Sequence, residues 1–371
     1  MLNKIIFPTC EKKKRYNCRH MANNQMKILE RVIDNAFDFL EKAITEFDAE
    51  PKLSIMHFSA AIELFLKSRL IHEHWSLIVK DKIPDKKKFE TGDFYSITIK
   101  ESIEKIRKVL GDDFPNKYKT AFEKIAQHRN KLVHFFHPEI KEKMLQIKQD
   151  IAIEECLGWY YLRLLISKWD GPFARYKKKV EELNAKMKKH RIFLKSVYEE
   201  IKPDIELAQK NGSIFKTCAS CQFNASEKST IASNVFLFKC RVCLLDEELI
   251  SIPCSKCEGL IEINAGDSEL IKCDFCNYSI SSTYIAEELN TKIIRSKDDA
   301  DEGPINCAYC STSDSVVAHD KLFICSRCRS ITRDAPRCEW CNERQIGGVL
   351  EDSFLYGCDF CPGRMGDLND D

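Results

Sequence analysis

Residues 127–135 read Gln127-His128-Arg129-Asn130-Lys131-Leu132-Val133-His134-Phe135, and the first half of the chain is organised around them. Their spacing predicts the last two turns of a helix, which Pro138 ends because proline cannot continue one. The segments before this stretch have helical periodicity. After residue 213 that periodicity disappears and cysteine pairs take over, so two different kinds of structure are expected.

Helical periodicity around the stretch predicts a bundle. Apolar residues recur every three or four positions in segments that Pro51, Gly111 and Gly171 separate. The predicted helices cover 24–47, 54–75, 98–111 with a capping box at Thr98 and Glu101, a segment from Pro115 through the stretch, and 139–169. The lysine-rich segment 80–88 is expected to be a loop. Short connections favour an antiparallel helical bundle over residues 22–171.

Two flanking segments are open to more than one interpretation. Residues 1–21 are basic and are expected to be a disordered tail or, through Cys10, Cys18 and His20, part of a metal site. Residues 172–213 are charged and carry a heptad pattern, with His190 in one seam position: Val180, Leu183, Met187, Leu194, Val197, Ile201. This pattern predicts either a dimerising coiled coil or a linker helix packed on its own bundle, limited by Pro203.

Charge and cysteine usage divide the chain at the same place. Residues 1–213 contain 42 Lys+Arg and 31 Asp+Glu, a net +11, and the remaining 16 against 26 give −10. A basic half is the natural partner of nucleic acid. Sixteen of the 19 cysteines follow residue 213, all in CxxC pairs. Without a secretion signal, this spacing indicates metal-bound thiolates in a reducing compartment, the cytoplasm.

The cysteine pairs form an internal duplication. They are Cys218/Cys221, Cys240/Cys243, Cys254/Cys257, Cys273/Cys276, Cys307/Cys310, Cys325/Cys328, Cys338/Cys341 and Cys358/Cys361. The last four repeat the first four at offsets of 89, 85, 84 and 85 residues, and both sets end in Cys-Asp-Phe-Cys. The expected modules are a double zinc ribbon over 214–282, an acidic linker over 283–304 and a second double ribbon over 305–371.

Zn²⁺ is the metal that these pairs predict, because four thiolates satisfy its tetrahedral preference. Gaps of 18, 15, 14 and 16 residues within sequential pairs suit four small β-rich ribbons, and gaps of 10 and 9 between them leave a cross-braced arrangement open. Four cysteines leave no position for water, so structural zinc is expected.

The acidic ribbon region favours a protein ligand or docking on the basic half. One group of arginines offers a nucleic-acid contact as the alternative to a solvated surface: Arg327, Arg329, Arg333, Arg337, Arg344.

Spacing alone does not single out Arg129 and His134. Chance predicts about 0.4 arginine–histidine pairs at this separation (17 × 9 / 371), and the chain has three. Context distinguishes this pair from Arg15/His20 and Arg69/His74: Asn130 adjoins it, it ends a helix, and the helix from His57 to Trp75 accompanies it.

These two helices together resemble the HEPN superfamily, helical ribonucleases whose signature is arginine, a polar residue, three residues and histidine. The resemblance covers residues 24–170. It implies metal-independent cleavage of RNA, tRNA included, by a homodimer, often as a toxin or an anti-phage defence effector in bacteria. Catalytic roles would fall to Arg129, Asn130 and His134. Glu63 and Lys67 are expected to be structural, with a supporting role in the site as the alternative. Some members carry a modifiable tyrosine two positions after the histidine, where this chain has Phe136.

The residues suit this chemistry independently of the resemblance. RNA supplies its own nucleophile, the 2′-OH, so a histidine that moves protons and an arginine that binds phosphorane oxygens form a minimal catalyst. Five helical residues rotate by about 140°, so Arg129 and His134 converge most simply across two facing copies. The alternative function is a non-catalytic dimeric adaptor whose ribbons bind protein or nucleic acid. No apolar run is long enough to predict a membrane span.

Overall fold

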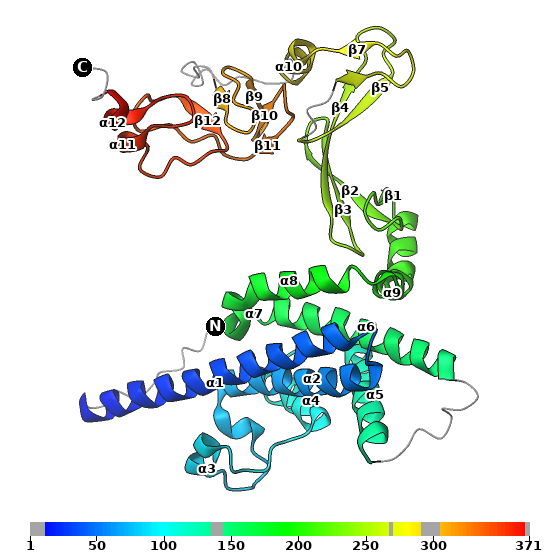
Figure 1. The fold of residues 1–371 in the computed structure, drawn as a ribbon, viewed down its shortest axis with the longest axis vertical. Helices are drawn as coiled ribbons and strands as arrows, with labels where there is room; N and C mark the ends of the chain where they lie inside the picture. The colour runs from blue at the N-terminus through cyan, green and yellow to red at the C-terminus, as the bar shows by residue number, and fades with distance from the viewer. Residues whose placement is uncertain (1–11, 135–143, 267–269, 291–304, 368–371) are drawn as a thin grey trace, which may run out of the picture. The chain divides into compact units, whose positions relative to one another are not determined.

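The structure is a computed structural model that describes residues 12–134, 144–266, 270–290 and 305–367 (Figure 1). The chain forms two compact units, residues 1–202 and 203–371, which meet within helix α9 (Arg191–Lys210). The first is helical and the second is rich in β-strands, which confirms the predicted fold class at this level. None of the described helices is both long enough and apolar enough to cross a bilayer.

The first unit is built from helices of very different lengths. Besides the start of α9, it contains α1 (Lys12–Glu46), α2 (Pro51–Glu73), α3 (Lys86–Thr91), α4 (Ile99–Lys108), α5 (Asn116–His134), α6 (Met144–Lys168), α7 (Asp170–Phe173) and α8 (Lys177–Met187), with 3-10 turns η1 (Trp75–Ile78) and η2 (Ala174–Tyr176). The Thr98–Glu101 capping box is present at the start of α4, as the sequence predicted.

Aromatic residues fill the core between these helices. α1 and α2 lie side by side (Figure 1), and the ring of Phe37 meets Phe65 edge-on with centroids 4.9 Å apart. α6 approaches α2 and α5 closely at Gly158, where a Cβ atom would lie only 2.4 Å from Ile125 and 2.8 Å from Phe58. The apolar spacing of the sequence therefore identified the buried faces of these helices.

Two expectations about local structure were wrong in the first unit. α1 begins at Lys12, inside the expected tail 1–21, because no proline or glycine interrupts residues 12–46 and helix-favouring residues extend the packed helix. The expected loop 80–88 ends in helix α3, which Asp85 caps by accepting from the amide of Lys87 at 2.8 Å and which buries Phe89. Cys10 and the side chains of Cys18 and His20 lie outside the described residues.

Segment 172–202 belongs to the helical unit. The expected seam is split between α8 and α9, and all six of its apolar residues are buried in this chain. The ring of His190 meets that of Phe47 edge-on, with centroids 5.1 Å apart, and its Nδ1 atom lies 3.0 Å from Oδ2 of Asp48. These contacts fasten the break between α8 and α9 to the end of α1. The interpretation as a helix packed on its own bundle is the one this burial favours.

The expectation that Pro203 limits this helix was wrong. α9 continues through Pro203 to Lys210. A proline inside a helix loses one backbone hydrogen bond. Burial of Val197, Ile201 and Ile205 on the same helix offsets that loss.

The second unit begins with one antiparallel sheet that spans the first two cysteine clusters. Its strands follow chain order: β1 (Phe215–Thr217), β2 (Asn224–Ala232), β3 (Val235–Cys240), β4 (Asp246–Pro253) and β5 (Leu260–Asn264). β4 leads from Cys243 to Cys254, so the first two ribbons share a strand. A small hairpin of β6 (Ile271–Lys272) and β7 (Ser279–Ile280) completes the first copy.

The second copy has shorter strands and two further small helices. β9 (Val316–His319), β10 (Leu322–Cys325) and β11 (Ile331–Thr332) form an antiparallel sheet, and β8 (Ile305–Cys307) pairs in parallel with β12 (Arg344–Ile346). Helices α11 (Ser353–Tyr356) and α12 (Gly363–Asp367) follow. The duplicated cysteine spacing thus survives although the strands between the cysteines differ.

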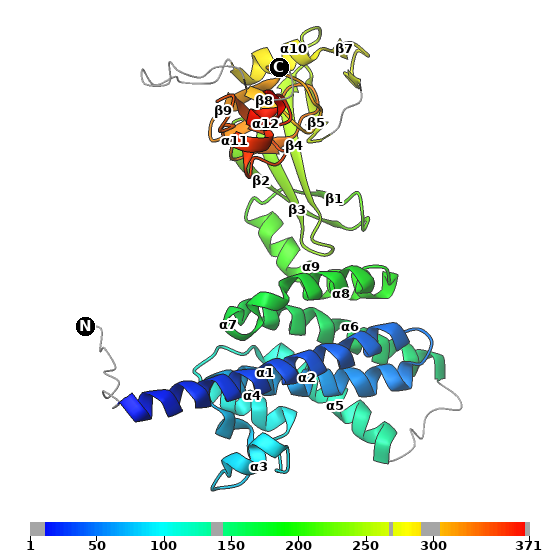
Figure 2. The same ribbon diagram turned by 60° about the vertical axis from the view of Figure 1, so that its left-hand side comes forward.

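Helix α10 (Ser282–Asn290) replaces the first part of the expected acidic linker 283–304. α10 lies beside β9 of the second copy (Figure 2). Its Ile285 and Leu289, four positions apart, are buried in a core that also contains Ile252 from the first copy and Ile324 from the second. The acidic composition had concealed this amphipathic spacing. Residues 291–304, which include the acidic run 297–303, lie outside the described residues.

Candidate metal centres and candidate active site

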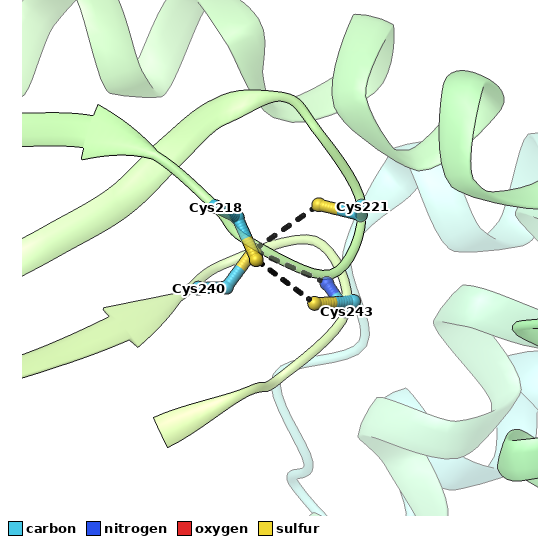
Figure 3. Close-up of side chains that lie close together, drawn as sticks. All are labelled: Cys218, Cys221, Cys240 and Cys243. Carbon is cyan, nitrogen blue, oxygen red and sulfur yellow. Dashed lines mark hydrogen bonds between the residues drawn. The ribbon is translucent and has the colours of Figure 1, made fainter. Parts of the chain in front are cut away.

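Four groups of four cysteines converge in the second unit, each from two sequential pairs. Sequential pairing, rather than the cross-braced alternative, is therefore what the fold contains. The groups are cluster 1 (Cys218, Cys221, Cys240, Cys243), cluster 2 (Cys254, Cys257, Cys273, Cys276), cluster 3 (Cys307, Cys310, Cys325, Cys328) and cluster 4 (Cys338, Cys341, Cys358, Cys361). Figure 3 shows the two turns of cluster 1 directing their sulfurs toward one point.

Sulfur separations in these clusters match a tetrahedral metal ion. Within cluster 1 the Cys218 and Cys243 sulfurs lie 3.5 Å apart, and in cluster 4 those of Cys341 and Cys358 lie 3.8 Å apart. Metal–sulfur bonds of about 2.3 Å at tetrahedral angles place two sulfurs about 3.8 Å apart. A disulfide requires about 2.05 Å. The clusters are therefore arranged as four metal sites, and the pairs are not arranged as disulfides.

Each cysteine pair sits in the same kind of turn. The residue after the second cysteine adopts a left-handed backbone, with φ between 51° and 63°, in seven pairs: Gln222, Leu244, Glu258, Asn277, Ser311, Arg329, Asn342. In the eighth pair Pro362 follows, and Gly363 has a φ of 69° instead. In the turn of Cys240, for example, the amide of Leu244 donates to the carbonyl of Cys240 at 3.0 Å. The turn aims both sulfurs to one side.

Backbone amides and neighbouring thiols lower the pKa of one cysteine in each cluster, whereas burial raises the pKa of others, such as Cys221 to about 11. A hydrogen bond from Cys240 lowers the pKa of Cys243 to about 5. The amide of Lys256 lowers the pKa of Cys254 to about 7. Burial raises the pKa of Cys328, but hydrogen bonds from Ser330 outweigh it and bring the value to about 7. A lowered thiol pKa suits a metal ligand, because the thiolate is the ligand form.

The arginines of the second copy act mainly within the protein. Arg329 is buried and donates to the carbonyl of Arg327. Arg344 donates to the carbonyl of Ala335 at 3.0 Å, and Arg337 donates to that of Asn342 at 3.0 Å. These contacts join three of the five arginines to the turns around the clusters. Arg327 and Arg333 are exposed, and Arg327 donates to the hydroxyl of Thr312 at 3.0 Å.

In the helical unit, Arg129 on α5 lies near Glu63 on α2, and Glu63 also binds Lys67 on the same helix. The Nη2 atom of Arg129 lies 3.8 Å from Oε2 of Glu63, and Lys67 donates to Oε1 of the same carboxylate. Lys67 also donates to the hydroxyl of Ser96 at 2.8 Å and is only 6% exposed. The Arg129 side chain is 34% exposed. One carboxylate therefore orients an accessible arginine and neutralises a buried lysine.

The remaining motif residues lie at the end of α5. Asn130 is exposed, and His134 is the last residue of the helix. The side chain of His134, together with Phe136, His137 and Pro138, lies outside the described residues. His128 points to α6 instead, where its Nε2 atom is 2.7 Å from Oε2 of Glu154. His128 therefore helps to fasten α5 to α6.

Two adjacent acids on α6 were not singled out from the sequence. Burial raises the pKa of Glu154, but hydrogen bonds from His128 and Lys124 outweigh it, so the net pKa is lowered. Burial of Glu155 raises its pKa to about 8, and its Oε1 atom lies 2.5 Å from the hydroxyl of Ser54. Two adjacent acids within an otherwise apolar helical segment could have indicated from the sequence that one of them is buried.

Comparison of the chain with protein-family models, with curated proteins and with solved structures finds no match.

Proposed function

We propose that the helical unit is a metal-independent endoribonuclease of the HEPN type. The observation that carries the proposal is the position of Arg129, partly exposed one residue before an exposed Asn130 and held by Glu63 across two helices. A cation oriented in this way can bind a phosphate oxygen without first losing side-chain freedom. The net charge of +11 over residues 1–213 (42 − 31) supports RNA as the substrate.

The proposed chemistry uses the 2′-OH of RNA as the nucleophile. Arg129 stabilises the charge that develops on the phosphorane oxygens, and Asn130 binds the backbone beside it. His134 ends α5, where the helix dipole favours the imidazolium form. It donates a proton to the leaving 5′-oxygen, while the 2′-OH releases its proton to water as the new oxygen–phosphorus bond forms. The products are a 2′,3′-cyclic phosphate and a free 5′-OH. Two copies of the chain complete the site, because five helical residues rotate by about 140° and so separate positions 129 and 134 around one helix.

We further propose that Zn²⁺ occupies the four cysteine clusters. Four thiolates at tetrahedral separation are its preferred structural ligands, and no cluster leaves a ligand position open. Bound zinc supplies folding free energy to a unit whose strands are short.

The ribbon region is proposed to recognise a ligand and regulate the nuclease, in a cytoplasmic toxin or anti-phage defence effector. Aromatic side chains within the cysteine turns support this role: Phe275 is 74% exposed and Tyr309 is 60% exposed. Exposed aromatics are common anchors of binding interfaces. The same observation favours the second candidate function, a non-catalytic dimeric adaptor that binds protein or nucleic acid through its ribbons.

Cleavage of mixed RNA and tRNA by the purified full chain tests the proposal. We expect cleavage with EDTA present in the assay and a loss of at least about 100-fold in Arg129→Ala and His134→Ala. Arg69→Ala is the matched control, because Arg69 belongs to another arginine–histidine pair and is ion-paired with Glu73 at 2.7 Å. Intact RNA with the wild-type chain, together with a partner that zinc chelation releases, would favour the adaptor.

A further inference from the structure

His319 joins three separate segments of the ribbon unit. It ends β9 in the second copy and is fully buried. Its Nδ1 atom lies 2.7 Å from the carbonyl oxygen of Leu289 on α10, and its Nε2 atom lies 2.6 Å from the carbonyl oxygen of Ser233 in the β2–β3 turn. One imidazole ring therefore connects the first copy, the helix after it and the second copy.

Each of the two contacts requires a hydrogen on the ring nitrogen that makes it, Nδ1 in one case and Nε2 in the other. Carbonyl oxygens only accept hydrogen bonds, whereas a neutral imidazole has a single N–H. The imidazolium form has two, and only that form satisfies both partners of His319. Loss of the proton would place a nitrogen lone pair against a carbonyl oxygen at 2.6 or 2.7 Å in a buried site. An unsatisfied buried contact of this kind opposes docking of the segments.

Asp320 binds the other side of the same peptide. The amide of Ser233 donates to Oδ2 of Asp320 at 2.7 Å, and this hydrogen bond lowers the pKa of Asp320. Adjacent residues of the second copy thus hold both the amide and the carbonyl of Ser233. The Asp320 carboxylate also provides a negative charge next to the His319 ring, which favours the imidazolium form of the ring.

The position on α10 favours a cation as well. Leu289 is the penultimate residue of the helix, in the last turn, where backbone carbonyls have no partner within the helix. The helix dipole stabilises positive charge at this end. The charged groups on the surrounding elements are Glu287 and Glu288 on α10, and Asp320 and the exposed Lys321 after β9; Ser233 and Asn234 of the turn do not titrate.

We propose that His319, as an imidazolium, is a proton-dependent latch that locks the two duplicated ribbon copies together. With hydrogens on both ring nitrogens, the Ser233 turn and α10 stay docked on β9. Without the second ring hydrogen, the docked contacts weaken and the copies separate locally while each retains its own cysteine clusters. The latch concerns the ribbon unit alone and is independent of RNA cleavage.

Nuclear magnetic resonance on the metal-loaded full chain tests the latch. We expect both ring nitrogens of His319 to carry hydrogens while the latch is closed. As the pH rises, exchange of the Ser233 amide, corrected for base catalysis, should accelerate together with loss of the ring proton. The opening constant should rise about tenfold per pH unit, since one proton is released. The amide of Phe238, within β3, provides the control and should show no such change.

Two variants separate the proton from simple packing. His319→Gln cannot gain a charge, so Ser233 exchange should be fast at every pH. Asp320→Asn keeps an oxygen for the Ser233 amide but removes the negative charge, so the latch should open at a lower pH. Bound metal per chain should equal wild type in both. If His319→Gln fails to fold, measurements of Ser233 exchange against pH in the wild type and in Asp320→Asn still test the proposal. A neutral ring in the closed form, or Ser233 exchange independent of ring charge, would overturn the proposal.

Discussion

Arg129 and Glu63 form an ion pair between α5 and α2, with 3.8 Å between Nη2 and Oε2. The same carboxylate accepts from Lys67, which is almost completely buried. Glu63 therefore has two roles: it compensates a buried charge, which affects stability, and it orients a more exposed one, which affects the proposed cleavage. These roles can be separated by substitution.

Glu63→Gln should lower both stability and cleavage. The amide keeps the size of the side chain but leaves the Lys67 charge with Ser96 as its described partner. We expect the free energy of unfolding to fall by about 1–3 kcal/mol, less than for a fully buried pair because Glu63 is 25% exposed. Cleavage should fall about tenfold through a less ordered Arg129. Urea unfolding and RNA cleavage assays measure the two effects.

Glu73→Gln is the matched control for this variant. Glu73 pairs with Arg69 on the same helix but is 45% exposed, so its loss should cost less than about 1 kcal/mol. Replacing Lys67 with methionine in the Glu63→Gln background removes the uncompensated charge and should restore part of the stability. Equal stability of wild type and Glu63→Gln would contradict a compensating role for Glu63.

Glu155 should make the helical unit less stable as the pH rises from about 5 to 8. The unfolded carboxyl loses its proton near its ordinary pKa of about 4.3, whereas the folded one keeps it up to a pKa of about 8. The folded state thus binds more protons across this window, and the free energy of unfolding falls with increasing pH. The linkage amounts to about 4–5 kcal/mol when complete.

Glu155→Gln is the test of that dependence. The amide mimics the neutral acid beside Ser54 and cannot ionise, so the decline between pH 5 and pH 8 should be flattened. Urea titrations followed by helical circular dichroism at several pH values measure the difference. An unchanged pH profile in Glu155→Gln would show that another group causes any decline.

Metal removal should unfold the ribbons and spare the bundle. We expect four zinc ions per chain, one per cluster, and three in Cys218→Ser or Cys257→Ser. Chelation should remove the metal from cluster 2 before cluster 1, because Cys257 is exposed whereas all four cysteines of cluster 1 are buried. The cysteines of cluster 2 should therefore be alkylated first. Elemental analysis gives the stoichiometry, and alkylation followed by mass spectrometry gives the order. Loss of bundle helicity on chelation would contradict independent folding of the two units.

Local sequence patterns predicted the structural features whose contacts lie within a few residues of one another along the chain. The capping box at Thr98 uses atoms three residues apart, and each cysteine turn closes within a few residues. The lengths of the gaps favoured sequential pairing of the cysteines, and the fold decided against the cross-braced alternative. The burial of residues at helical spacing, such as Phe37 and Phe65, could also be predicted, because each helix buries one apolar face away from water.

Amino-acid composition gave the wrong structure where the burial of a few apolar residues decided it, although most of the surrounding residues are exposed and charged. The acidic segment after residue 282 contains α10, whose Ile285 and Leu289 enter the core despite their charged neighbours. The heptad of residues 180–201 was compatible with a second chain or with the bundle. Its burial in the bundle depends on the position of α1, which no local pattern specifies.

The sequence by itself determined the eight cysteine pairs, the two classes of structure and the placement of Arg129 in the last turns of a helix, because these depend on spacing along the chain. Only the tertiary structure decided that Glu63 meets Arg129 and that His319 lies between carbonyls 86 and 30 residues away. The physical reason is that a buried charge is set by partners from distant segments, which become neighbours only when the chain has folded.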